Sequence, residues 1–248
     1  MSVSRAELLA IEEAAVRGWP ALQSSVIDGW SWRHTSGGSV RANTVAALAF
    51  TGSDVEAAIT EAERCYRAAG APPRFTVSEV SAPADLDERL AARGYIRGDD
   101  HVTMAKRVGG GAMPADALEV GAAPGPEWME VYLSGLSPDR RGIAPSILAG
   151  LPEPRMYFAC YRDGKIVGSG LSIPDASLAS VQCMATLAEH QRQGCAQSVL
   201  AAIECWAAGR ACSLLYLQTG ADNTAAQALY RRCGFFLAGR YHTRVLAR

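Results

Sequence analysis

The 248-residue sequence lacks several features that would assign a function class at once. It has no apolar run of 18 residues, so we expect no membrane-spanning helix. Its formal net charge is −1, which gives no bulk electrostatic reason to expect binding to nucleic acid or a membrane. Its first residues lack the short apolar block of a secretory signal. We therefore expect a cytoplasmic protein without nucleic-acid or membrane partners.

Metal-ligand and disulfide patterns are also lacking. The seven cysteines are odd in number and form no C-x-x-C pair, and the four histidines are scattered along the chain. This usage predicts reduced, mostly buried thiols and no metal site.

A glycine-rich stretch divides the chain. "RVGGGAMPADA" (107–117) has three consecutive glycines and a proline, which indicate a flexible joint. We predict a first domain over 1–108, a linker over 109–114 and a second domain over 115–248.

Helical and strand patterns alternate through the second half. The hairpin 155–173 turns at Asp163 and Gly164, and apolar spacing over 195–209 places Val199, Leu200, Ile203 and Trp206 on one helical face. The almost wholly apolar "SLLYLQT" (213–219) is typical of an interior strand. The helix that follows begins at Asn223 and ends at Gly234. The order predicts a mixed α/β fold.

The first half repeats this plan at a shift of 140 residues (234 − 94). "LDERLAARGYI" then lies on "AAQALYRRCGFF", and "VEAAITEAERCYRAAG" lies on "CAQSVLAAIECWAAGR". We predict two copies of one domain, packed as an internal pseudo-dimer. The alternative is chance similarity between two α/β halves that share a helix–strand–helix order.

The segment "QRQGCA" (191–196) joins a strand to a helix. The first amides of a helix have no internal partners and carry partial positive charge, so a diphosphate can accept several of them at once. Gly194 has no Cβ and Ala196 has the smallest one, which permits close approach. The alternative is a helix terminus that binds only water.

A second motif follows one helix and one strand later, and with it the second half resembles the GNAT superfamily of N-acetyltransferases. The superfamily's Q/R-x-x-G-x-G/A loop matches Gln191, Gly194 and Ala196. Its N-x-x-A-x-x-L-Y-x-x-x-G-F segment matches Asn223, Ala226, Leu229, Tyr230, Gly234 and Phe235. The resemblance covers residues 115–248 and implies tandem GNAT-like domains.

The resemblance implies acetyl-CoA as co-substrate. The amides of Arg192, Gln193, Gly194, Cys195 and Ala196 are expected to hold its diphosphate, with Gln191 adding a side-chain donor. The strand edge at Met184, Ala185 and Thr186 and the side chain of Asn223 are expected to hold the pantetheine arm.

Two side chains are candidates for proton transfer. Tyr230 is a neutral O–H donor at pH 7 and a candidate general acid for the leaving thiolate; its alternative is an aromatic residue that only packs under the sheet. Glu189 is a candidate base that acts through water on the attacking amine; its alternative is a solvated loop acid. Neither Cys183 nor Cys195 has a recognisable base partner, so we expect direct attack by the amine.

The first half lacks the corresponding groups. The shift places Asp54 on Gly194 and Glu56 on Ala196, and these carboxylates suit a helix N-terminus but repel a diphosphate. We expect a degenerate domain that packs against the catalytic half. Two of its stretches are expected to be ordinary strands, "WSWR" (30–33) and "RANTV" (41–45); the alternative for Trp30, Trp32 and Arg33 is a part in the acceptor pocket.

The sequence therefore predicts an acetyltransferase that acetylates a primary amine, either a small molecule or a peptide. The alternative is a non-catalytic acyl-CoA-binding sensor or interaction module. We expect either a monomer with an internal pseudo-dimer or a dimer.

Overall fold

The computed structural model describes residues 1–247. In chain order its elements are α1 (Arg5–Arg17), β1 (Gln23–Ile27), β2 (Trp30–His34), η1 (Val40–Ala42), β3 (Val45–Ala46), α2 (Val55–Ala68), β4 (Arg74–Ser78), α3 (Leu86–Ala92), β5 (Ile96–Arg107), β6 (Ala117–Gly121), α4 (Pro126–Ser134), α5 (Pro138–Arg141), α6 (Ala144–Ala149), β7 (Met156–Arg162), β8 (Lys165–Ser172), β9 (Pro174–Asp175), β10 (Leu178–Ser180), β11 (Gln182–Thr186), η2 (Ala188–His190), α7 (Cys195–Ala208), β12 (Leu214–Gly220), α8 (Thr224–Arg232) and β13 (Phe236–Val245).

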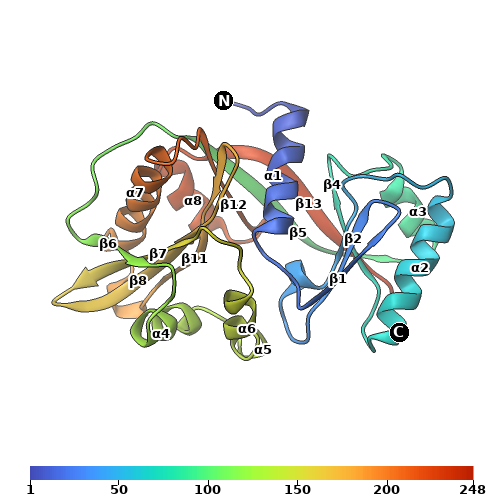
Figure 1. Ribbon diagram of the computed structural model, residues 1–248, viewed down its shortest axis with the longest axis horizontal. Helices are drawn as coiled ribbons and strands as arrows, with labels where there is room; N and C mark the ends of the chain where they lie inside the picture. Colours follow the sequence, from blue (N-terminus) through green and yellow to red (C-terminus); the bar gives the residue numbers. More distant parts are fainter. Residues whose placement is uncertain (248) are drawn as a thin grey trace.

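The strands form two sheets, which confirms the predicted α/β class. The larger sheet has the order β1-β2-β3-β4-β13-β5-β12-β10-β9, and the smaller one has the order β11-β8-β7-β6. Helices α2 and α3 lie beside the strands of the first half of the chain, while α7 and α8 lie beside those of the second half (Figure 1). Helix α1 crosses the middle of the molecule between them (Figure 1).

The internal repeat is visible in the helix bounds. Helix α7 spans 195–208 and helix α2 spans 55–68, so both ends differ by 140 residues (195 − 55). Helices α8 and α3 likewise end at Arg232 and Ala92. The predicted capping side chains are present: Asp54 accepts from the Ala57 amide at 3.0 Å, and Asn223 accepts from the Ala226 amide at 3.2 Å.

The two halves exchange their last strands. Strand β13 lies between β4 and β5, antiparallel to both, and β5 in turn pairs with β12. The C-terminal strand of each repeat therefore completes the sheet of the other, and the chain ends beside α2 (Figure 1). The predicted linker 109–114 contains no helix or strand, but the sheets do not divide there. The domain boundary stays a prediction.

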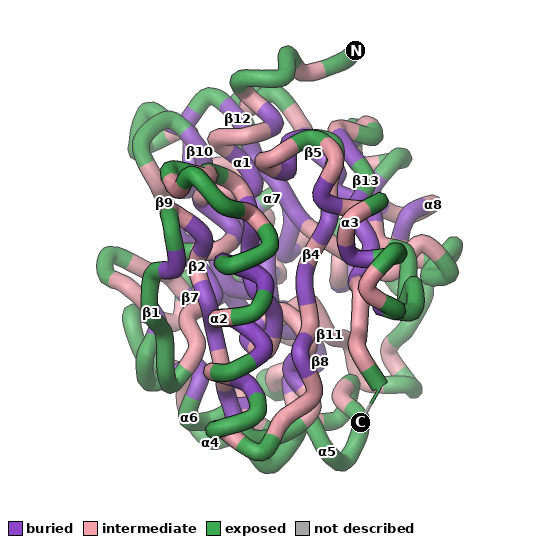
Figure 2. The backbone as a smooth tube through the Cα atoms, turned by 90° about the vertical axis from the view of Figure 1, so that its right-hand side faces the viewer, coloured by how far each residue is buried: buried purple, intermediate pink, exposed green. Residues whose placement is uncertain are grey.

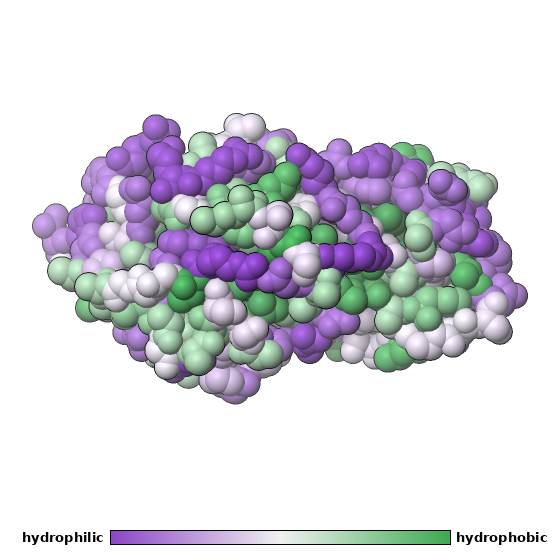
Figure 3. Space-filling model, turned by 90° about the horizontal axis from the view of Figure 1, so that it is seen from above, coloured by the Kyte–Doolittle hydropathy of each residue, from purple (hydrophilic) through white to green (hydrophobic). Residues whose placement is uncertain are grey.

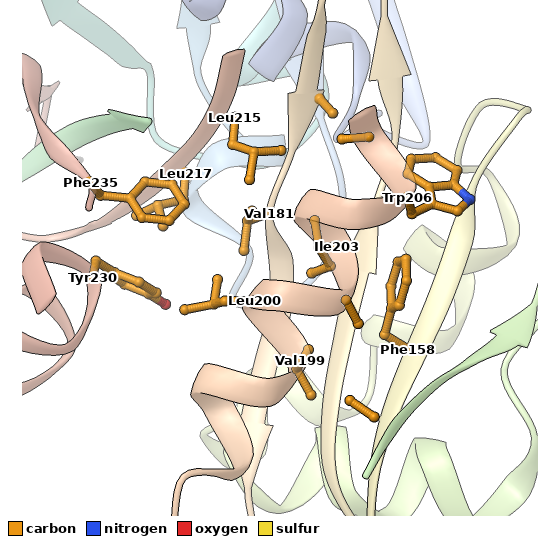
Figure 4. Close-up of a cluster of buried hydrophobic side chains, with 14 of the residues drawn as sticks. Phe158, Val181, Val199, Leu200, Ile203, Trp206, Leu215, Leu217, Tyr230 and Phe235 are labelled. Carbon is orange, nitrogen blue, oxygen red and sulfur yellow. The ribbon is translucent and has the colours of Figure 1, made fainter. Parts of the chain in front are cut away.

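Helix α7 packs closely on the smaller sheet because β8 carries glycine where the two meet. A Cβ at Gly170 would lie 2.4 Å from Val199 Cγ1, and one at Gly168 would lie 3.5 Å from Cys195 Cβ. The predicted apolar face of α7 is buried against Phe158 and strand β12 (Figure 4). This packing fixes the position of the helix N-terminus.

The first half has its own core around Trp30, Tyr66 and Phe75, and the tube view shows the buried stretches of α2 and β4 facing each other (Figure 2). Trp30, Trp32 and Arg33 lie on strand β2, so the expected strand is confirmed. The expected strand over 41–45 is wrong: a 3₁₀ turn covers Val40–Ala42 and strand β3 begins only at Val45.

Seen from above, hydrophilic side chains run along the molecule from one half to the other, with smaller hydrophobic areas between them (Figure 3). Within residues 1–247, no helix is both long and apolar enough to cross a membrane. All seven cysteines are free thiols.

Candidate active site

The candidate site lies where two neighbouring strands part. Strand β10 pairs in parallel with β12, and their last hydrogen bond runs from the Val181 amide to the Tyr216 carbonyl at 2.8 Å. From Gln182 onward the chain joins the smaller sheet as β11 and pairs with β8. A bulge marks the change, with Cys183 at φ +53° and the register shifted between Gln182 and Ala185. The other edge of β11 is left without a strand partner.

The turn before α7 presents bare amides. Arg192 and Gly194 have positive φ, +62° and +86°, and the first hydrogen bond of the helix runs from the Ser198 amide to the Gly194 carbonyl at 3.0 Å. Within residues 1–247, the amides from 192 to 197 meet no protein acceptor. Successive amides in such a turn form a concavity that suits an anion.

Side chains on either side hold this turn in place. The Gln191 Nε2 donates to the Thr186 carbonyl at 3.4 Å, and the Gln193 Nε2 donates to the Glu189 carbonyl at 2.9 Å. Arg162, from the β7–β8 hairpin, donates to the Gln193 carbonyl at 3.3 Å. The bare amides are therefore a fixed feature of the fold and not a frayed helix end.

The edge of β11, the turn and helix α8 enclose a cleft of about 500 Å³. This volume falls in the range of small-molecule sites. Nine of the predicted residues line it: Met184, Ala185, Thr186, Gln191, Arg192, Gly194, Cys195, Ala196 and Tyr230.

Tyr230 lines the cleft from α8. Its side chain extends from α8 toward Leu200 of α7, with the hydroxyl at the end facing that helix (Figure 4). The residue is 8 % exposed, and burial raises the pKa of its phenol to about 12. Its hydroxyl donates to no group in residues 1–247, so the proton is free for a ligand.

Three predicted residues lie outside the cleft lining. Gln193 supports the turn, and the amide side chain of Asn223 caps α8 and donates to Thr219 Oγ1 at 3.4 Å. Glu189 lies in the exposed η2 turn and lines a separate surface groove with Glu127 and Glu130. This position favours the alternative that we weighed for Glu189, a solvated loop acid.

The sequence analysis missed part of the lining. One face of α8 contributes Ala225, Ala228, Leu229 and Arg232, and the spacing of three and four residues from Ala225 could have indicated it. The small alanine side chains leave room beside the edge of β11, and Arg232 adds a positive charge.

Cys195 lines the cleft, whereas Cys183 does not. Burial raises the pKa of the Cys183 thiol to about 12, so it stays protonated at neutral pH. Cys195 is buried at the start of α7, with 2 % of its surface exposed. In residues 1–247, no group of three or more histidine, cysteine or acidic side chains lies close enough to hold a metal ion.

The equivalent turn of the first half is closed to an anion. Asp54 occupies the α2 amides, and Glu56, at the second helical position, forms ion pairs with Arg89 and Arg93 at 3.1 and 2.9 Å. Leu90, which lies where the second half has Tyr230, is fully buried. The charged groups at this turn neutralise one another without a ligand.

The fold matches that of solved GNAT acetyltransferase structures. A GCN5-related N-acetyltransferase from Kribbella flavida matches 100 % of this chain with 97 % of its own, at a TM-score of 0.69 and 17 % identity. A tandem GNAT protein from the clavulanic acid biosynthesis pathway matches 82 % of this chain with 74 % of its own, at a TM-score of 0.61 and 16 % identity.

Residues 5–244 match the profile of the family described as "Probable histone acetyltransferase Rv0428c C-terminal", and the chain belongs to this family. It is also 26 % identical over 250 residues to the uncharacterized N-acetyltransferase YobR of Bacillus subtilis (strain 168), covering 96 % of this chain and 98 % of that protein.

Proposed function

We propose that this protein transfers the acetyl group of acetyl-CoA to a primary amine by direct attack. The observation that carries the proposal is the cleft: one wall is a row of bare amides, the second is a free strand edge, and the third is helix α8, which carries Tyr230. A diphosphate fits the amides of the turn, and an amide-bearing chain fits the edge of β11 as an added strand.

Different residues of the chain bind acetyl-CoA and assist the transfer of its acetyl group. Acetyl-CoA supplies the activated acetyl thioester. The turn around Gly194, with Arg192 and Arg232, binds negative charge, and the edge of β11 orients the chain that follows. The Met184 amide is our candidate for stabilising the oxyanion. Tyr230 donates its proton to the departing thiolate, for which a neutral phenol held in a buried site is suited.

Titration of acetyl-CoA into the full chain, followed by thiol release with a panel of amines, tests the proposal. We expect one acetyl-CoA per chain and turnover with at least one amine. Tyr230→Phe should lower turnover by roughly one to three orders of magnitude, since it removes only the donated proton, with little change in acetyl-CoA affinity.

The second candidate function is a non-catalytic acyl-CoA sensor. It predicts binding without turnover on any amine and no effect of Tyr230→Phe. Leu200→Met, a change of similar volume at the α7 residue toward which the Tyr230 side chain extends, is the matched control for packing (Figure 4). A loss of turnover in both variants would contradict the assignment of Tyr230 as the acid.

A further inference from the structure

A second, smaller cavity lies between the two halves. Its wall includes residues of α1, β2, η1, β12 and β13, and its volume is about 30 Å³. A buried water needs roughly 10–15 Å³ on this measure, so the cavity holds about two water-sized groups. It is too small for a whole amine substrate but has room for the two oxygens of a carboxylate.

The cavity contains more positive than negative charge. Arg33 and Arg41 line it together with one carboxylate, that of Glu12. Glu12 accepts hydrogen bonds from Thr103 Oγ1 at 2.6 Å and from Gln218 Nε2 at 2.9 Å. Within residues 1–247, neither arginine forms an ion pair. With Glu12 ionised, one further negative charge would neutralise the cavity.

Arg33 is buried without an adequate partner. It is 6 % exposed, and its two hydrogen bonds, to the Trp19 carbonyl at 3.5 Å and to Thr44 Oγ1 at 3.3 Å, are long. Its Nε is buried and has no acceptor among the described residues. A buried charge is costly unless it is paired. The unpaired guanidinium of Arg33 therefore lowers the stability of the folded protein.

The guanidinium of Arg41 is oriented by the ring of Trp19. The guanidinium carbon of Arg41 lies 4.7 Å from the ring centroid of Trp19. Stacking on an indole orients a guanidinium while leaving its edge N–H groups free to donate.

The cavity lies next to the point where the strands part. Gln218, which lines it, lies on β12 two residues beyond Tyr216, the residue that makes the last hydrogen bond across to Val181. Leu215 and Leu217 point to the α7 and α8 side of β12, while Tyr216 packs with α1. The cavity therefore lies on the face of β12 opposite the acyl-CoA cleft.

We propose that Arg33 and Arg41 bind the carboxylate of the acceptor, so that the acceptor is a small amino acid whose amine reaches the thioester where β11 and β12 part. The inference rests on the proposed function and adds the substrate class to it. It also gives the first half a part in the site, since both arginines come from that half. A lysine-rich peptide with a blocked carboxyl terminus would lack the group that the cavity recognises.

The test compares amines in matched pairs with acetyl-CoA: glycine with glycinamide and leucine with leucinamide, plus the blocked lysine-rich peptide. Because an acid and its amide differ in amine pKa, the readout is the change in their kcat/KM ratio on mutation. Arg41→Gln should lower the ratio of acid to amide roughly ten- to a hundredfold, through KM for the acid, since a charge-assisted pair is lost. Arg41→Lys, which keeps the positive charge, should restore part of the acid-to-amide ratio.

Arg64→Gln is the control, because it removes the same charge from an exposed site on α2, where Arg64 forms an ion pair with Glu61. In this variant the acid-to-amide ratio of kcat/KM should equal that of the unchanged protein. An unaltered ratio in Arg41→Gln, or a preference for the lysine-rich peptide over every free amino acid, would overturn the inference and leave the proposed function standing. Absence of turnover with every amine, despite acetyl-CoA binding, would remove the proposed function and the inference with it.

Discussion

Ala196→Glu is the change that most sharply separates a diphosphate site from an ordinary helix N-terminus. Ala196 is the second residue of α7 and lines the cleft, and Glu56 occupies the same position in α2. In the first half two arginines, Arg89 and Arg93, neutralise Glu56. The 140-residue shift places Leu229 and Cys233 at those positions, so neither of these two arginines has a counterpart in the second half.

The magnitude follows from the charges. A carboxylate about 5 Å from one phosphate charge, at an effective dielectric constant of about 20, costs about 3 kcal/mol. That corresponds to a loss of acetyl-CoA affinity of roughly a hundredfold. The same carboxylate lies at the positive end of the helix dipole, where it should stabilise the free protein by about 0.3–1 kcal/mol. Affinity and stability should therefore change in opposite directions.

The assay is calorimetric titration of acetyl-CoA together with denaturant unfolding of the free protein. Ala196→Gln is the matched control, because glutamine has the same length and shape but no charge. We expect the glutamine variant to bind far more tightly than the glutamate variant. Equal affinities in the two variants would refute the assignment of the diphosphate to this turn.

Two further predictions concern the joint between the halves. Burial raises the folded-state pKa of Glu12 from 4.5 to about 6, so the folded protein loses up to about 2 kcal/mol of stability as pH rises through that interval. The free energy of unfolding of Glu12→Gln, measured with denaturant, should therefore rise by that amount relative to the unchanged protein between pH 4 and pH 7.5. A difference between the two proteins that does not change with pH would contradict this prediction. A fragment of residues 115–248 lacks β5, which separates β12 from β13, and should be unfolded or aggregated by circular dichroism and gel filtration; a monomeric, folded and active fragment would contradict the role of the strand exchange.

Local patterns predicted the elements well because each depends on nearby residues. The face of Val199, Leu200, Ile203 and Trp206 follows from helical periodicity, and all four are buried. The caps of Asp54 and Asn223 follow from the short polar side chains that compete for helix amides. The position of the cleft followed from the same reasoning, because bare amides at a turn are a local property.

Pairing between distant strands could not be predicted in this way. The last strands of the two repeats, β5 and β13, hold equivalent places in the chain order, and periodicity does not say which sheet each one completes. The 3₁₀ turn at Val40–Ala42 was missed because a three-residue turn has no periodic signal. The cavity that contains Arg33 and Arg41 depends on both features, and no short stretch of sequence brings those side chains to Glu12.

A crystal structure of the full chain with coenzyme A tests the central claim most directly. We predict density for one diphosphate per chain, within hydrogen-bonding distance of the amides from 192 to 196, and none at the turn before α2. Density at the turn around Asp54, or at neither turn, would contradict the account.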